Sequence, residues 1–315
     1  MLDSHARPRP SLGGETLIAT LVGTERTSEP PRLHLGRRAR ELYAARETLL
    51  NLIRKELKVK YTASVLGAVW SLLNPVVFLA VFSFVVRVLG NRIADFPVFL
   101  LSGLLAWNFF SVSLTSGARS VVDQANLVKK VAFPREILPL SSVGVASFDL
   151  LLQSAVLWLF IVVSGHGFRW PDLAIYPLAL VVLVTFTTAL TLWVSAMNVR
   201  YRDVGHLLNL GLLVWFWLTP IVYQAFLVKR TLAGTSILGV DAWRLYLLNP
   251  MATLILGFQR ALYGATPPGA EPVLPRVGLG WHVATLSILA VLSATLLLLA
   301  WRSFFHRSGD FAEEL

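Results

Sequence analysis

Residues 173–199 read LAIYPLALVVLVTFTTALTLWVSAMNV and carry no charged side chain. An α-helix rises about 1.5 Å per residue and a bilayer core is about 30 Å thick, so roughly 20 apolar residues suffice to cross it. The stretch therefore predicts a membrane-spanning helix. Five further long runs contain at most one acidic or basic residue each, and they cover residues 66–86, 96–118, 137–164, 204–228 and 283–301. We expect an all-α integral membrane protein with six spanning helices.

The composition excludes several classes of protein. Hydrophobic residues make up 55% of the chain and charged residues 15%, which disfavours a soluble domain of this size. The absence of cysteine excludes disulfides, thiolate metal sites and cysteine nucleophiles. No Gly-Lys pair occurs, so a nucleotide-hydrolysing loop is missing, as are a His-x-x-x-His pair, a metal-binding carboxylate cluster and a G-x-S-x-G elbow. We expect a chain that is not an enzyme and binds no cofactor or metal itself.

The net charge of +10 is distributed unevenly. Twenty of the 28 lysines and arginines lie before the first predicted span, between the second and third, between the fourth and fifth, or after the sixth. Cytoplasmic loops of membrane proteins carry an excess of Lys and Arg. The pattern predicts that both termini are cytoplasmic, and the charge indicates topology instead of a nucleic-acid surface.

The chain before the first span divides into two parts. Residues 1–40 are rich in Pro, Arg, Ser and Gly and predict a flexible cytoplasmic tail. Residues 41–62 predict an amphipathic helix in the membrane surface, with cations opposite an apolar face and the Lys60 ammonium group reaching the lipid headgroups. The apolar face consists of Leu49, Ile53, Leu57 and Tyr61. An ordinary cytoplasmic helix that caps the first span is the alternative.

Residues 224–282 form the longest break between spans. The uncharged stretch 245–259 inside it is too short to cross a membrane and too apolar for a simple loop. Asn249 and Pro250 favour a turn there, so we expect an outer re-entrant hairpin that gates or shapes the exit. The predicted segments are thus 1–40, 41–62, the six-span domain 63–303 and a cytoplasmic C-terminal tail 304–315.

Five short motifs occur along the chain. They are KVKYTASVLGAVWSLLNP (58–75), LVKKVAFPREILPL (127–140), NVRYRDV (198–204), TPIVY (219–223) and LNPMAT (248–253). In this order and spacing they resemble the permease subunit of ABC-type polysaccharide exporters, which move lipid-linked O-antigen, capsule, teichoic acid or galactan. The resemblance covers the chain from about Leu49 to Trp301. The chain departs from the family at Thr62-Ala63, where a further Arg is common.

The resemblance implies a homodimer of six-span subunits in the bacterial cytoplasmic membrane, bound to two copies of a separate ABC ATPase subunit. ATP and Mg would be held by that ATPase, the substrate would be a lipid-linked polysaccharide, and membrane lipids would surround the helices. No nucleic acid is implied. The loop that couples to the ATPase corresponds here to Lys129, Lys130, Phe133, Pro134, Arg135 and Glu136.

Pro134 favours a bend in this loop, because it cannot continue a helix and disfavours helical geometry at the residue before it. The bend would present Phe133 as an apolar knob between charged neighbours, suited to a groove on the ATPase. The alternative is a solvated, positively charged loop followed by an ordinary helix start.

Polar and aromatic residues inside the spans are candidates for the translocation path. Asp149 lies about a dozen residues into the third span, where an ionised carboxylate needs a partner, a polar cavity or a proton. Aromatic rings stack on sugar faces, so a ring-lined conduit would pass a polymer. The candidate path residues are Trp107, Phe110, Asp149, Trp158, Trp215 and Trp217. The alternatives are a structural hydrogen bond for Asp149 and the interfacial aromatic belt for the rings.

The function predicted by the resemblance is export of a lipid-linked polysaccharide, driven by ATP hydrolysis in the partner. An ABC permease for small lipids or drugs is the first alternative. A polyprenyl-dependent membrane glycosyltransferase is the second, but it requires loop carboxylates, and the long outer segment contains only Asp241 and Glu271. The sequence leaves open which glycan is carried, whether it moves during or after synthesis, and the role of residues 1–40.

Overall fold

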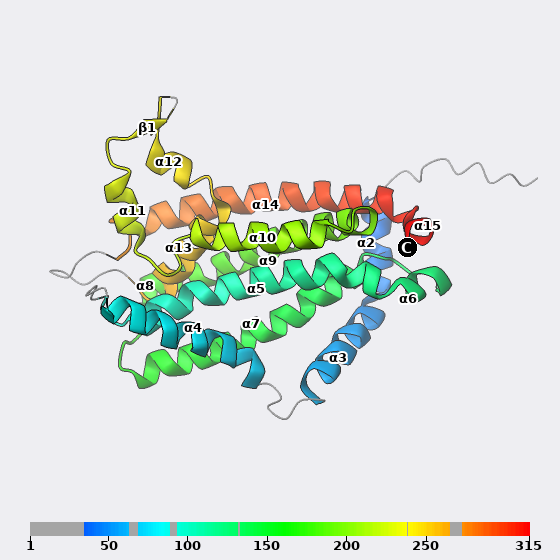
Figure 1. Ribbon diagram of the computed structural model, residues 1–315, viewed down its shortest axis with the longest axis horizontal. Coiled ribbons are helices and arrows are strands. Elements are labelled where there is room, and N and C mark those ends of the chain that lie inside the picture. Colours follow the sequence, from blue (N-terminus) through cyan, green and yellow to red (C-terminus); the bar gives the residue numbers. More distant parts are fainter. Residues whose placement is uncertain (1–34, 63–68, 89–92, 132, 238, 265–272) are drawn as a thin grey trace, which may run out of the picture. The chain divides into compact units, whose positions relative to one another are not determined.

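The computed structural model describes residues 35–62, 69–88, 93–131, 133–237, 239–264 and 273–315. They form the helices α2 (Leu35–Ala44), α3 (Arg46–Thr62), α4 (Val69–Val88), α5 (Phe96–Asp123), α6 (Ala125–Lys130), α7 (Ile137–Val163), α8 (Trp170–Leu173), α9 (Ile175–Arg200), α10 (Val204–Trp217), α11 (Ala225–Thr231), α12 (Ala242–Tyr246), α13 (Pro250–Leu262), α14 (Leu279–Ser308) and α15 (Phe311–Glu314). The only strands in these ranges are β1 (Ser236–Ile237) and β2 (Val240–Asp241), which pair antiparallel. The predicted all-α fold is confirmed for this part of the chain (Figure 1).

Four helical segments within the described residues are long and apolar enough to cross a membrane. They are α5, α7, α14 and the continuous segment Trp170–Arg200, which joins α8 to α9. Two further apolar helices are shorter, at Leu72–Val88 in α4 and in α10. Each of the six coincides with one of the predicted apolar runs.

α10 is shorter than the fifth apolar run because it ends at Trp217. Pro220 has no amide hydrogen and disfavours helical geometry at the residue before it, so the helix stops. Side chains from α13 and its cap bond the carbonyl groups left at this end. Asn249 Nδ2 donates to the Leu218 oxygen at 3.2 Å, and Gln259 Nε2 donates to the Pro220 oxygen at 3.0 Å.

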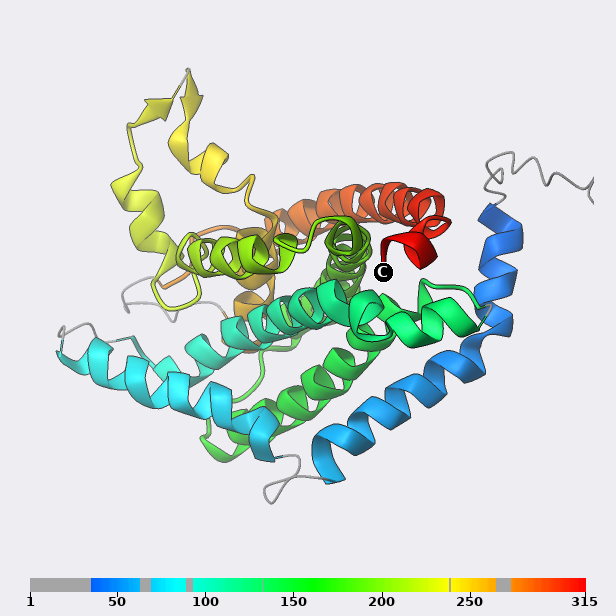
Figure 2. The ribbon, with the colours of Figure 1, turned by 45° about the vertical axis from the view of Figure 1, so that its right-hand side comes forward.

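α5 is the central helix and the most deeply buried of the four long segments. It lies between α7 and α10 in both ribbon views (Figures 1 and 2) and also packs on α9 and α13. Where α5 crosses α9, Gly117 lies so close to Thr191 that no space remains for a Cβ atom. Small residues at such crossings allow the two backbones to approach closely.

The two ends of the bundle carry different elements (Figure 1). α6 and α15 contact each other at one end, which we call the α6 end, and α8 and the C-terminus of α13 meet at the other, the α8 end. α13 is nearly completely buried and packs on α5, α8, α9 and α14. The α8 end is therefore closed by a short helix that runs inside the bundle.

Helical structure extends into both predicted tails. α2 begins at Leu35, inside the stretch predicted as a flexible tail, and the remainder of that stretch lies outside the described residues. α14 continues to Ser308, and the rings of Phe304 and Phe311 are both buried, with centroids 5.3 Å apart. The predicted tail 304–315 is folded because these two apolar side chains join a cluster at the α6 end.

Candidate functional site

A pocket of about 590 Å³ opens at the α6 end between α3, α5, α7 and α10, and we call it the polar pocket. Leu138 is the one apolar residue that lines it within the described part of the chain. Its charged residues are Glu56, Arg119 and Asp123, and its hydroxyl and amide side chains include Thr115, Ser116, Ser142 and Asn209. The volume falls in the range of about 300–1,000 Å³ that is typical of ligand sites. The lining offers hydrogen bonds to a hydrophilic ligand.

Glu56 lies between the polar pocket and α7. Ser141 Oγ donates a hydrogen bond to its carboxylate at 3.3 Å. Burial raises the pKa of Glu56 above its ordinary value of 4.5, and the hydrogen bond from Ser141 offsets only part of the rise. The Glu56 carboxyl group therefore binds its proton more tightly in the folded protein than in the unfolded chain. As the pH rises above about 4.5, loss of this proton lowers the free energy of unfolding.

We expect Glu56→Gln to flatten this part of the pH dependence. The variant should gain thermal stability relative to the parent protein as the pH rises from about 4.5 toward 7. The measurement is the melting temperature of the detergent-solubilised protein at a series of pH values. Glu47→Gln, on the exposed part of the same helix, is the control and should follow the parent curve. A Glu56→Gln variant that keeps the parent slope contradicts the expectation.

α3 is fastened to α7 by a second contact, which we call the clasp. Lys60 Nζ lies 2.5 Å from Asp149 Oδ2, and the Tyr61 hydroxyl donates a hydrogen bond to Asp149 Oδ1. Asp149 is buried, so its carboxylate has the charged partner that its depth in α7 requires. The sequence predicted that the Lys60 ammonium group reaches the lipid headgroups. In the structure it binds this carboxylate instead.

The predicted apolar face of α3 is the more buried one, and α3 (Figure 2) packs on α7. Its four residues, Leu49, Ile53, Leu57 and Tyr61, are all partly buried, while the cations Arg54, Lys55 and Lys58 are exposed. Ile53 lies against Gly144 of α7 with no room for a Cβ atom on the glycine. α3 is thus a packed part of the subunit and borders the polar pocket.

α6 and the residues after it form the loop that the resemblance assigns to ATPase coupling. Lys129 and Lys130 are exposed, and Val131 is 51% exposed. Phe133 is partly buried against an apolar cluster that contains Val128. Phe133 is not a fully projecting knob as predicted, because its ring packs on the subunit's own apolar side chains, and Val131 is an exposed apolar residue of the loop.

The charged residues after Pro134 face the inside of the subunit. Glu136 is 0% exposed and accepts hydrogen bonds from Arg38 of α2 and Trp301 of α14. Arg135 is partly buried, and this burial lowers the pKa of its guanidinium group. The prediction that Glu136 flanks an exposed knob is wrong, because its carboxylate is buried and hydrogen-bonded within the chain.

Three of the six candidate path residues meet in one aromatic cluster. The rings of Phe110 and Trp215 lie 5.1 Å apart at 81°, and Trp107 lies 5.6 Å from Phe110. Phe186 stacks on Phe110 from α9. Phe110 and Trp107 are buried in the main core, so within one subunit these rings fill space between helices.

Trp217 adjoins this cluster through Phe216, whose ring centroid lies 5.5 Å from those of both Trp107 and Trp217, and it is 55% exposed at the end of α10. The other two candidates lie apart from the cluster: Trp158 packs on Tyr176 with ring centroids 5.5 Å apart, and Asp149 belongs to the clasp. The fold of a single subunit therefore does not bring the six residues together.

The turn at Asn249 and Pro250 is fixed to the end of α10. Asn249 Oδ1 accepts a hydrogen bond from Trp215 Nε1 at 2.7 Å and caps α13 by accepting from two of its amides. Pro250 is the first residue of α13, where a missing amide hydrogen costs little. At the other end of α13, Arg260 Nη2 lies 2.9 Å from the buried Asp172. Both ends of α13 are thus held by polar contacts.

Known proteins are similar to this sequence over most of its length. The sequence pattern of ABC-2 type transporters matches residues 47–263, from α3 to the end of α13. A Myxococcus xanthus protein named O-antigen export system permease protein RfbA is 33% identical, over 89% of this chain and 99% of that protein. A Klebsiella pneumoniae protein of the same name is 30% identical, over 70% of this chain and 82% of that protein. The chain therefore belongs to the ABC-2 type transporter family.

Proposed function

We propose that this chain is the permease subunit of an ATP-driven exporter that moves a lipid-linked polysaccharide out of the cytoplasm. The observation that carries the proposal is the similarity to the Myxococcus xanthus O-antigen export permease, which extends over 99% of that protein. The polar pocket supports it, because its hydroxyl, amide and charged groups suit a hydrophilic polymer. The name of this Myxococcus xanthus relative also favours a polysaccharide over a small lipid or drug as the substrate.

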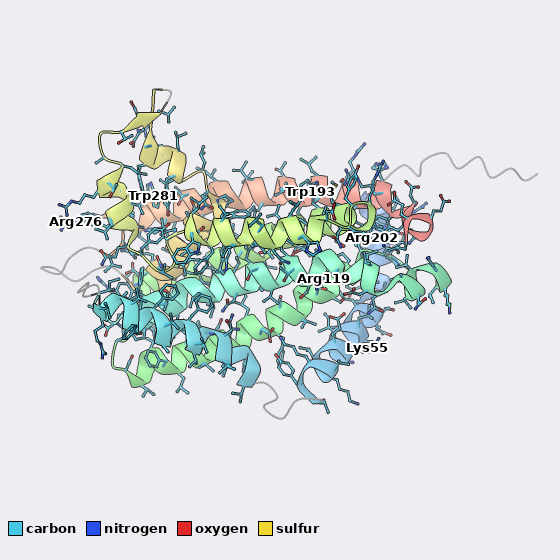
Figure 3. The ribbon with its side chains drawn as sticks, viewed as in Figure 1. Lys55, Arg119, Trp193, Arg202, Arg276 and Trp281 are labelled. Atoms are coloured by element: carbon cyan, nitrogen blue, oxygen red, sulfur yellow. The ribbon has the colours of Figure 1, made fainter. Side chains whose placement is uncertain are left out.

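In this proposal the α6 end faces the cytoplasm. Lys55, Arg119 and Arg202 lie toward that end (Figure 3), as an excess of cations on cytoplasmic loops requires. α4 and α10 complete a set of six spans, and α3 lies in the membrane surface. The turn at Asn249 lies within the bilayer as a re-entrant hairpin, where its non-helical backbone is tolerated because Asn249 and the end of α10 bond each other's polar groups.

The proposed assembly contains two copies of this chain and two ATPase subunits, which bind ATP and Mg. α10 exposes an apolar face, and we expect a second copy to cover part of it. This face includes Leu207, Leu210, Leu213 and Trp217. ATP binds two arrangements of the assembly with different affinity, and this difference drives the change between them. The loop that begins at α6 receives the motion.

We expect Lys129→Glu/Lys130→Glu to weaken the complex with the partner ATP-hydrolysing subunit. Reversing two exposed charges at a contact surface replaces attraction by repulsion, so retention of the ATPase should fall about tenfold. The measurement is co-purification after co-expression, with the amount of ATPase retained per permease determined on a gel.

Lys229→Glu/Arg230→Glu in α11 is the matched control, because it makes the same charge change in the outer segment. The control should retain the ATPase at the parent level. Equal retention in both double variants contradicts the assignment of the loop. A parent chain that retains no ATPase contradicts the proposed function itself.

A further inference from the structure

Glu136 joins three elements that are far apart in the sequence. Arg38 Nε donates to Glu136 Oε1 at 2.9 Å and Arg38 Nη2 donates to Oε2 at 2.7 Å, so the guanidinium group binds both carboxylate oxygens. Trp301 Nε1 donates to Oε1 at 3.3 Å. α2, the loop before α7, and α14 thus share one buried carboxylate, and we call these three residues the junction.

Arg38 is itself fixed from the other side. Its Nη1 lies 2.7 Å from Glu41 Oε2, and its guanidinium carbon lies 4.9 Å from the ring centroid of Phe305 on α14. Burial alone would lower the pKa of Arg38, but the hydrogen bonds and charges of Glu136 and Glu41 raise it overall. Arg38 therefore stays charged and held in one orientation, and a bidentate guanidinium–carboxylate contact of this kind is strongly directional.

The junction links the coupling loop to helices on both sides of it. Glu136 is the last residue before α7, five residues after the exposed end of the loop at Val131. Arg38 lies on α2, which leads directly into α3, and α3 is bound to α7 by the clasp at Asp149. A displacement of the loop at Glu136 cannot occur without moving α2 and α14 or breaking buried, charge-assisted hydrogen bonds.

We propose that the junction of Arg38, Glu136 and Trp301 transmits displacement of the coupling loop to α2–α3 and to α14, with Arg38 as a positioning residue for ATP-driven export. This inference rests on the proposed function and extends it to α2, whose residues 35–40, Arg38 among them, belong to the stretch that the sequence predicted to be a tail. Arg38 contacts neither substrate nor nucleotide in this proposal. It keeps the loop and the two helices moving as one body.

The test uses the complete complex of this chain with its ATPase, with three readouts. They are ATPase retention, ATP hydrolysis by the purified complex, and surface polysaccharide on cells whose own copy of the gene is deleted. We expect Arg38→Ala to lower export about tenfold at a given rate of ATP hydrolysis, because broken coupling wastes hydrolysis. Arg37→Ala is the matched control, since Arg37 neighbours Arg38 on α2, also pairs with Glu41, and is largely exposed. The control should keep parent export.

Two further variants separate positioning from folding. Arg38→Lys keeps the charge but loses the two-pronged contact, so it should recover only part of the export per ATP. Trp301→Phe keeps an aromatic ring, although a smaller one, and removes the N–H donor, so it should give a smaller loss of the same kind. Parent-level export per ATP in Arg38→Ala overturns the proposal, as does a loss that is fully explained by a smaller amount of assembled complex. If the parent chain retains no ATPase, the proposed function fails instead, and the two failures are therefore distinguishable.

Discussion

Lys60→Met should destabilise the folded subunit by about 1–2 kcal/mol, because it takes the ammonium group, whose side chain is 37% exposed, away from the buried carboxylate of Asp149. The hydrogen bond from Tyr61 remains but does not replace a positive charge. We expect the detergent-solubilised variant to unfold at a clearly lower temperature.

The double variant Lys60→Met/Asp149→Asn provides the decisive comparison. Removing both charges removes the cost of burying either one, so most of the lost stability should return. Lys58→Met is the matched control, since Lys58 is exposed on the same helix and should behave as the parent. Lys60→Met and Lys58→Met proteins of equal stability would show that the clasp contributes nothing.

Gly117→Ala should cost about 1–3 kcal/mol, the usual price of overpacking a core. A Cβ atom at residue 117 would collide with the Thr191 methyl group, and Thr191 is fully buried and stiff because it is branched at Cβ. α5 and α9 would have to separate along their crossing. The thermal stability of the purified subunit measures the effect.

Thr191→Ser should rescue Gly117→Ala. Only the methyl carbon of Thr191 would lie too close to the new Cβ atom, and serine lacks this methyl group. Gly211→Ala is the control, since α10 offers no heavy atom within 4 Å of its added carbon. Alanine favours a helix over glycine, so this control should be neutral or slightly stabilising. A Gly117→Ala protein that matches the control would disprove the tight crossing.

The apolar runs predicted the long helices well, because twenty or more uncharged residues have few other stable conformations in a membrane. They did not predict the end of α10. The uncharged apolar run continues to Val228, although the helix ends at Trp217. Several residues after Pro220 are apolar because they are buried against other parts of the subunit, not because they extend the helix. Pro220 was the available signal, and it competes with the apolar pattern around it.

The partners of the buried charges were not predictable from the sequence. Asp149 required a partner because of its depth, but Lys60 lies 89 positions away, and Glu136 meets Arg38 across 98 positions. Periodicity indicates which face of a helix is buried and not which distant side chain it meets. For the same reason the aromatic residues of the spans could be recognised, while their division between core and surface followed only from the fold.

The burial of α13 has a consequence for how the protein is made. The helix has 13 residues, about 20 Å of length, and nearly all of them are buried, so its surroundings are protein instead of lipid. α14 supplies part of the surface on which α13 packs, its seat in the subunit, since Gly257 lies against Leu286. That seat is incomplete until the last span has been synthesised, although α5 and α9 are inserted much earlier. The order of synthesis thus delays completion of the α8 end until the first half of α14 has been made.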